Sequence, residues 1–217
     1  MFGLSLIQFA AVAALPLLFA ITVHEVAHGY VARRLGDHTA EMLGRLTLNP
    51  VKHIDPVGTI LVPAILMLAG GFIFGWAKPV PVDARNMRNP KRDMALVAVA
   101  GPLANLAMAI LWALVAKLGL ALAAASPWAS VPLVLMGKIG ILLNLILLVL
   151  NLLPLPPLDG GRVLTGLLPD RLSARVARIE PYGFFILIGL LATGYLGKIL
   201  GPVVFGLDRM LVLLTGI

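Results

Sequence analysis

Cysteine is absent from this sequence of 217 residues. Its absence excludes disulfide bonds, cysteine-ligated zinc, iron–sulfur clusters and thiol nucleophiles. It also means that cysteine usage does not indicate an oxidising or a reducing compartment. A metal ion bound by side chains must therefore use histidine and carboxylate ligands, for which the chain has 4 His residues and 10 Asp and Glu residues.

Charged residues are scarce as well. They make up 12% of the chain, against roughly 25% in soluble globular domains, while 60% of the residues are hydrophobic and the mean hydropathy is +1.00. These values exclude a water-soluble domain and predict an integral membrane protein surrounded by the lipid bilayer. The first charge of the chain is Glu25, so no basic region precedes the first apolar run and we expect no cleavable signal peptide.

Acidic residues are fewer than basic ones. The chain has 10 Asp and Glu residues and 17 Lys and Arg residues, for a net charge of +7. A basic excess can indicate nucleic-acid binding. Here, however, the basic residues lie between apolar runs, where the preference of Lys and Arg for the cytoplasmic side of a membrane explains them. We therefore expect no nucleic-acid partner.

Long uncharged runs predict the membrane crossings. A helix of about 20 residues covers a hydrocarbon core of about 30 Å. Three runs reach this length, the last with one lysine inside it: Leu4–Val23, Met94–Ala116 and Val131–Leu153. Two further segments lie at roughly 183–198 and 201–217. The predicted fold is an all-α membrane protein, a polytopic helical bundle with about five transmembrane helices, with four or six as alternatives.

The run Val57–Ala77 is uncharged but differs from the others. Pro63 and the pair Gly70 and Gly71 interrupt it, and both of its flanks are basic. A full crossing would place one basic flank outside, so we predict a re-entrant or interfacial segment. With this interpretation, all but four of the 17 basic residues fall on the inner side.

Two segments near this run predict a small membrane-associated β element. Leu43–Leu48 alternates polar and apolar residues in part, and Ala77–Asp83 has the composition of an extended chain. Pro79 and Pro81 cannot donate ladder hydrogen bonds, so the second strand is expected at an edge. Further along, arginines spaced by four and three residues around 172–179 predict an amphipathic surface helix.

Ionisable residues occur together at the inner end of the first apolar run, in His24-Glu25-Val26-Ala27-His28, which fits the pattern H-E-x-x-H. Histidines four apart share one face of a helix, so both imidazoles can reach one ion. Glu25 lies about 100° round the helix and can address a water in an open coordination position. A charge inside a membrane helix costs about 2.5 to 3.5 kcal/mol, and a bound metal ion removes that cost. The pattern predicts a zinc hydrolase site.

Catalytic zinc takes three protein ligands, so a third ligand must come from elsewhere. Asp159 follows a proline-rich stretch at the inner end of the third run, where the prolines prevent helix continuation and Gly160 and Gly161 allow a close approach. Asp159 lies at the same membrane boundary as His24 only if the run Val57–Ala77 does not cross the membrane. The residues alone leave several candidates open: His38, Glu41, His53, Asp55 and Asp159.

Five separated motifs occur in a fixed order along the chain: His24–Gly29, Gly44–Pro50, His53–Pro56, Ala100–Asn105 and Asn151–Arg162. Together they resemble the site-2 protease family of intramembrane zinc metalloproteases, in the compact branch without a PDZ or CBS domain, over roughly residues 15–165. The resemblance implies that zinc is held by His24, His28 and Asp159. It also implies that Glu25 is the general base and that a membrane-inserted β segment receives the unwound substrate.

The resemblance implies a function and an arrangement of the chain. The expected activity is zinc-dependent hydrolysis of peptide bonds in or near transmembrane segments of membrane-protein substrates. The protein is expected in the plasma membrane of a prokaryote, as a multi-pass protein with its site near the cytoplasmic side. One membrane domain is expected over 1–217, with a catalytic core at about 4–165 and C-terminal helices at about 171–217. Neither the substrate nor the oligomeric state is indicated.

Three further polar residues are candidates for stabilising the oxyanion or binding the substrate: Asn105, Asn151 and His53. For the two asparagines, a hydrogen bond between helices is the alternative role. Two other classes of protein are rivals to a protease. A metal transporter would place ligands at several depths, and a non-catalytic scaffold would have no need of Glu25.

Overall fold

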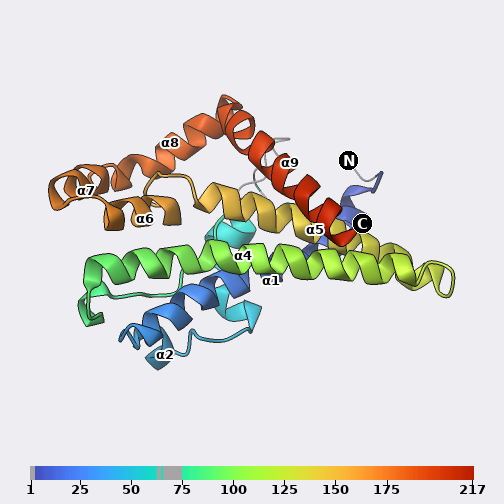
Figure 1. Cartoon of the computed structure of the whole chain (residues 1–217), viewed down its shortest axis with the longest axis horizontal. Coiled ribbons are helices and arrows are strands. Elements are labelled where there is room, and N and C mark those ends of the chain that lie inside the picture. Colours follow the sequence, from blue (N-terminus) through green and yellow to red (C-terminus); the bar gives the residue numbers. More distant parts are fainter. Residues whose placement is uncertain (1–2, 63–64, 66–74) are drawn as a thin grey trace.

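The structure, a computed structural model, describes residues 3–62, 65 and 75–217. Three long helices pack on one another to form a bundle (Figure 1): α1 (Leu6–Arg34), α4 (Pro90–Ala121) and α5 (Pro127–Asn151). Each is long and apolar enough to cross a membrane. The expected all-α membrane protein is confirmed, and these helices cover the first three predicted runs except for two residues at the start of the first run and two at the end of the third.

Shorter helices complete the described part of the chain. They are α2 (Thr39–Met42), η1 (Pro50–His53), η2 (Pro56–Leu61), η3 (Ala84–Asn86), α6 (Asp159–Leu167), α7 (Asp170–Ala177), α8 (Glu180–Ala192) and α9 (Tyr195–Thr215). Three of them, α2, α6 and α7, lie at the end of the bundle where α1 ends and α4 begins (Figure 1). α7 has no buried residue, as expected for the predicted surface helix.

Local sequence signals explain where α1 begins and ends. Ser5 and Gln8 form a capping box, in which Ser5 Oγ accepts the Gln8 N–H at 3.3 Å and Gln8 Oε1 accepts the Ser5 N–H at 2.9 Å. At the other end, Arg33 and Arg34 lie at the negative end of the helix dipole. Gly36 then adopts a left-handed φ of 110°, which ends the helix. The H-E-x-x-H pattern therefore lies within one continuous helix, near its C-terminal end.

The C-terminal helices differ from the prediction. α8 and α9 are bent by 82° and together have the length and composition of one broken span. The break falls at Gly194, which adopts a left-handed φ of 73°, and not near residue 200, because Pro202 is accommodated inside α9. α8 has 13 residues and so covers only about 20 Å. The described residues therefore contain three spanning helices, or four with the bent pair, and the predicted five are not confirmed.

The predicted β element is not found in the described part of the chain. Leu43–Leu48 and Ala77–Asp83 are both described, and neither forms a strand. The second segment has its carbonyl groups bound by a side chain, since Arg45 Nη2 donates to the carbonyls of Lys78 and Pro79 at 2.9 and 3.3 Å. Its two prolines supply no N–H for a ladder. Side-chain contacts therefore replace the strand pairing that the composition suggested.

The run Val57–Ala77, predicted to be re-entrant, lies mostly outside the described residues. Its two described ends are in contact, because Trp76 N–H donates to the Gly58 carbonyl at 3.0 Å. A Cβ added to Gly58 would lie 2.3 Å from the Trp76 indole. A straight crossing would separate the ends by about 30 Å. The contact between the ends does not fit a single straight crossing, and most of the predicted re-entrant segment lies outside the described residues.

Candidate metal centre

Three side chains of metal-binding types meet inside the bundle. α1 contributes His24 and His28, and α6 contributes Asp159, its first residue. Asp159 Oδ2 lies 3.3 Å from Nε2 of each histidine, and the two Nε2 atoms are 3.0 Å apart. All three residues are buried. The structure thus brings together the two histidines of the H-E-x-x-H pattern and one of the five candidate third ligands.

The other candidate ligands have local roles. His38 Nδ1 and Glu41 Oε2 pair with each other at 2.8 Å on the surface. Asp55 Oδ1 accepts the N–H groups of Val57 and Gly58 and so caps η2. Among the described residues, none of these side chains joins the cluster of His24, His28 and Asp159.

The far side of each imidazole faces a hydrogen-bond acceptor. His24 Nδ1 lies 2.6 Å from Asn105 Oδ1, and His28 Nδ1 lies 2.7 Å from the Val97 carbonyl oxygen. Because these oxygens can only accept, each Nδ1 carries the proton and donates. Each Nε2 of a neutral ring therefore presents a lone pair toward the centre of the cluster.

The near sides of the cluster hold acceptors only. The two Nε2 lone pairs face the Asp159 carboxylate, whose buried Oδ2 has no hydrogen-bond partner within the described structure. Without a cation, these groups repel one another and a buried anion is left unsatisfied. Two imidazoles and one carboxylate are donors that hydrolytic zinc sites use. The residues therefore fit one divalent metal ion, held by His24, His28 and Asp159.

Two glycines permit this close approach. A Cβ on Gly101 of α4 would lie 2.4 Å from His28 Nε2 and 2.5 Å from His24 Cε1. A Cβ on Gly160 would lie 2.3 Å from the Leu153 carbonyl oxygen. The close approach expected at Gly160 is present. The role of Gly101 was missed, although a glycine inside an apolar helix is a signal of close packing.

A chain of amides lies behind His24. Asn105 on α4 and Asn144 on α5 are fully buried. Asn105 Nδ2 donates to the Ala20 carbonyl at 3.2 Å and to Asn144 Oδ1 at 3.0 Å, and Asn144 Nδ2 donates to the Gly140 carbonyl at 2.8 Å. Both N–H groups of the Asn105 amide are thus used within the protein. Asn105 has no donor left for an oxyanion, and the alternative role, a hydrogen bond between helices, is the one present.

The remaining two polar candidates, Asn151 and His53, differ in burial and in the hydrogen-bonding group that is left free. Asn151 is half-buried and donates through Nδ2 to the Leu147 carbonyl at 3.0 Å, which leaves its second N–H for another partner. His53 is buried, and its Nε2 donates to the Thr47 carbonyl at 2.9 Å. A neutral His53 therefore presents Nδ1 as an acceptor, and this buried atom has no partner among the described residues. Such a ring cannot donate to an oxyanion through Nδ1.

Glu25 lies outside the three-residue cluster and is half-buried on α1. Its Oε2 accepts the N–H of Val80 at 2.7 Å. Val80 belongs to the extended segment that follows the Val57–Ala77 run, so the carboxylate is oriented by a distant part of the chain. This contact could not be predicted from the sequence, because nothing in the H-E-x-x-H pattern relates positions 25 and 80.

Comparison with known proteins agrees with this geometry. The model of peptidase family M50 matches residues 12–131 and 122–191. "Putative zinc metalloprotease YwhC" of Bacillus subtilis is 42% identical over 206 residues, which cover 93% of this chain and 90% of that protein. "Putative zinc metalloprotease Rip2" of Mycolicibacterium smegmatis is 34% identical over 183 residues, covering 83% of this chain and 66% of that protein. No solved structure matches significantly. The chain belongs to peptidase family M50, the site-2 protease family of membrane metalloproteases.

Proposed function

We propose that this protein is an intramembrane zinc metalloprotease that hydrolyses peptide bonds in or near transmembrane segments of other membrane proteins. One observation carries the proposal: two imidazole lone pairs and an unpartnered carboxylate oxygen converge among helices that are apolar enough to cross a membrane. The relatives named as zinc metalloproteases support zinc as the metal. The single cluster of metal-binding side chains among the described residues supports one ion per chain. Three protein ligands leave one position of a tetrahedral site open.

The chemistry divides between the metal and the chain. Zinc, when bound, activates water for attack and polarises the scissile carbonyl. Glu25 is the proposed general base, because it neighbours His24 on α1, lies outside the ligand set and has only one carboxylate oxygen bound, by Val80. It takes the proton of the attacking water and passes it to the leaving amine. The contacts to each Nδ1 keep both imidazoles in the tautomer that can bind a metal.

Asn105 and Asn151 are proposed to have different roles. Asn105→Leu is expected to weaken zinc binding by roughly 10- to 100-fold, because it removes the acceptor that orients His24. Asn151→Leu is expected to leave zinc affinity unchanged and to lower kcat by roughly 10²-fold, since Asn151 has an N–H left for the substrate. Zinc titration against a competing chelator and turnover of zinc-saturated protein measure the two effects. Unaltered zinc affinity in Asn105→Leu would contradict the role of Asn105.

We also propose that residues 46–48 capture an extended stretch of the substrate. The carbonyl groups of a transmembrane helix are hydrogen-bonded within it, so the helix must unwind before a protease can cleave it. An exposed, extended edge favours unwinding by adding the peptide as a strand. Within the described structure, the N–H groups of Leu46, Thr47 and Leu48 have no partner, and the Leu48 side chain is exposed.

Thr47→Pro tests this capture. It removes the central N–H of the edge, so we expect turnover to fall roughly fivefold, as for the loss of one hydrogen bond worth about 1 kcal/mol, with zinc still bound. Thr47→Val is the matched control, because it also removes the hydroxyl that accepts the Asn49 N–H but keeps its own N–H. Equal turnover of the two variants would reject the proposed edge.

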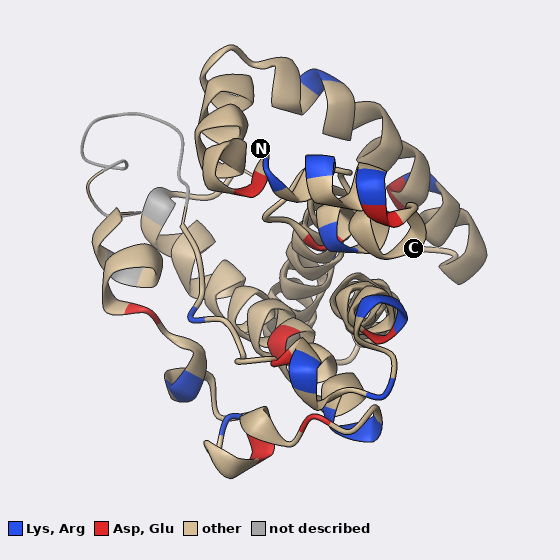
Figure 2. Cartoon of the chain, turned by 90° about the vertical axis from the view of Figure 1, so that its left-hand side faces the viewer, with Lys and Arg blue, Asp and Glu red and all other residues tan. Residues whose placement is uncertain are grey.

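The proposed location is a prokaryotic plasma membrane, with the site near the cytoplasmic side. Figure 2 looks onto the end of the bundle that carries α6 and α7, where Lys and Arg are spread over loops and short helices. Basic loops mark the cytoplasmic side. His28 lies close to the end of α1 at this same end of the bundle. The proposal has four crossings, made by α1, α4, α5 and the bent pair α8 and α9, together with a re-entrant segment at Val57–Ala77.

Cleavage by the purified protein tests the proposed function. We expect zinc-loaded protein to cut some members of a panel of single-pass membrane proteins within or beside the membrane segment. A chelator should stop the cleavage and added zinc should restore it. A metal transporter would bind zinc but leave every substrate intact, and a scaffold would do neither. Cleavage that resists the chelator, or no cleavage across the panel, would overturn the proposal.

A further inference from the structure

Two buried side chains of opposite charge lie outside the metal centre. Asp37 is 0% exposed and Arg45 is 9% exposed. Within the described part of the chain, neither forms an ion pair with another side chain. Buried charges without an opposite charge are costly unless hydrogen bonds satisfy them. Both side chains bind the same stretch of backbone, which indicates a shared purpose.

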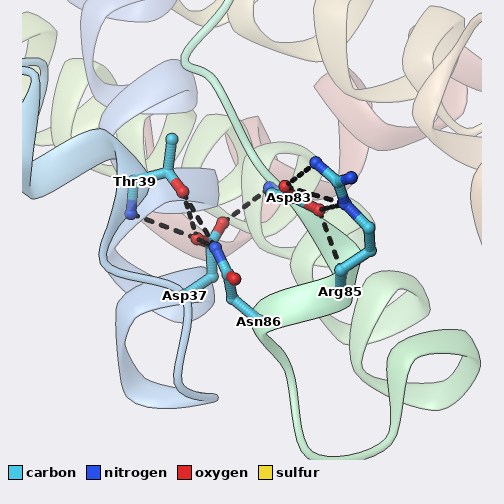
Figure 3. A network of polar contacts seen from close by, with 5 residues as sticks. All are labelled: Asp37, Thr39, Asp83, Arg85 and Asn86. Carbon is cyan, nitrogen blue, oxygen red and sulfur yellow. Dashed lines mark hydrogen bonds and ion pairs between the residues drawn. The ribbon is translucent and has the colours of Figure 1, made fainter.

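Asp37 lies just beyond the end of α1 and collects four hydrogen bonds (Figure 3). Its Oδ1 accepts the N–H of Thr39 at 3.1 Å, the hydroxyl of Thr39 at 2.5 Å and the amide of Asn86 at 2.9 Å. Its Oδ2 accepts the N–H of Asp83 at 2.7 Å. Burial by itself would raise the pKa of Asp37, but these donors outweigh burial and lower the pKa below its ordinary value. The carboxylate is therefore a charged hub that joins the end of α1 to residues 83–86.

Arg45 binds the other end of the same stretch. Its Nη2 donates to the carbonyl oxygens of Lys78 at 2.9 Å and Pro79 at 3.3 Å. A guanidinium suits this task because its donors are held in a rigid plane. Residues 78–83, which we name the support segment, are thus fixed by Arg45 at the beginning and by Asp37 at the end.

Val80 lies between these two attachments. Its N–H donates to Glu25 Oε2 at 2.7 Å, and its side chain is buried. The side chain packs directly on α1, since a Cβ on Gly29 would lie 2.8 Å from Val80 Cγ1. The register of the support segment along α1 therefore decides where the Glu25 carboxylate is held.

From this geometry we propose that Asp37 and Arg45 are positioning residues, which hold the support segment so that the Val80 N–H orients Glu25 for proton transfer. The inference rests on the proposed role of Glu25 as the general base. A glutamate has several rotatable bonds, and holding it in one rotamer beforehand removes an entropic cost from the reaction. A displacement of about 1 Å at a catalytic group can cost about 10²-fold in rate.

A double-mutant cycle between Asp37 and Val80 tests the inference. Asp37→Asn is expected to lower kcat by roughly 10- to 100-fold, with KM and bound zinc little changed. Val80→Pro removes the N–H and should have a similar effect. The double variant should be no slower than Val80→Pro alone, because both changes act through one hydrogen bond. Val80→Ala, which keeps the N–H, is the control for the lost side chain.

Two further measurements separate positioning from general destabilisation. The Val80 amide should exchange its hydrogen faster in Asp37→Asn than in the unaltered protein. It should not do so in Arg85→Gln, which removes only the exposed pair between Arg85 and the Asp83 carboxylate (Figure 3). If Asp37→Asn does not fold, Arg45→Lys replaces it in the cycle with the same expectation.

Additive losses in the cycle, or zinc lost from a folded Asp37→Asn protein, would overturn this inference while leaving the proposed protease intact. Full activity of Glu25→Gln, in contrast, would overturn the role of Glu25 itself. The two failures are therefore distinguishable by experiment.

Discussion

Glu25→Gln is expected to lower the rate of peptide hydrolysis by roughly 10²- to 10⁴-fold, the range that general base catalysis contributes, while zinc stays bound. Glutamine has nearly the same shape, and its amide oxygen can still accept the Val80 N–H. It cannot take a proton from water at neutral pH. The measurement is turnover of a cleavable membrane substrate together with the zinc content of the purified variant.

Glu41→Gln is the matched control for this experiment. Glu41 is an exposed glutamate that pairs with Arg33 and His38 on the surface, and it lies outside the metal cluster. We expect this variant to keep both zinc and activity. Zinc loss in Glu25→Gln would mean that Glu25 helps to hold the metal. Retained proteolysis would mean that another group takes the proton.

Gly101→Ala should abolish activity although it changes neither a ligand nor a charge. Its new Cβ would lie 2.4 Å from His28 Nε2, closer than real Cβ contacts allow, and helix backbone fixes its position. The imidazoles must therefore shift from the positions in which they meet Asp159, and we expect zinc affinity to fall by about 10²-fold, the upper end of losses on altering a residue that supports a metal ligand. Zinc titration and thermal unfolding in detergent measure the effect.

The stability of this variant should separate a local effect from a global one. The overlap with the imidazoles costs about 1 to 3 kcal/mol and the preference of alanine for helix returns about 1 kcal/mol. The metal-free variant should therefore lose at most about 2 kcal/mol relative to the metal-free parent, whereas added zinc should stabilise it much less than the parent. Gly206→Ala on α9 is the control, since nothing lies within 4 Å of a Cβ there. Normal zinc binding by Gly101→Ala would show that α4 does not support the centre as described.

The sequence predicts those parts of the fold that depend on one segment at a time. The long apolar runs at the positions of α1, α4 and α5 predict helices because a lipid-exposed backbone must satisfy its own hydrogen bonds. The β element and the break between the last helices were predicted wrongly. The surrounding structure decides whether the backbone of Ala77–Asp83 pairs with a strand or with the Arg45 side chain. It also decides whether a helix ends at Gly194 or near Pro202.

In the site, too, the sequence predicts the features that lie within one segment but not the contacts between distant segments. His24, Glu25 and His28 are recognisable because a helix fixes their spacing, and Asp159 because prolines and glycines surround it. Asn144 is an amide in an apolar run, which signals a buried hydrogen bond but does not identify the partner. Its contact with Asn105 joins positions 39 residues apart, and the Val80 contact with Glu25 joins positions 55 residues apart. Only the folded chain reveals such pairs.

The proposed ligands are made at different times during synthesis. Residue 159 follows residue 28 by 131 positions (159 − 28). A ribosome adds about 5–20 residues per second, so the histidines precede their carboxylate by roughly 7 to 26 s. During that interval the nascent chain has the two imidazoles of the proposed site but not the carboxylate of Asp159. With the proposed ligands, the metal centre therefore cannot be complete until the third long helix has been made.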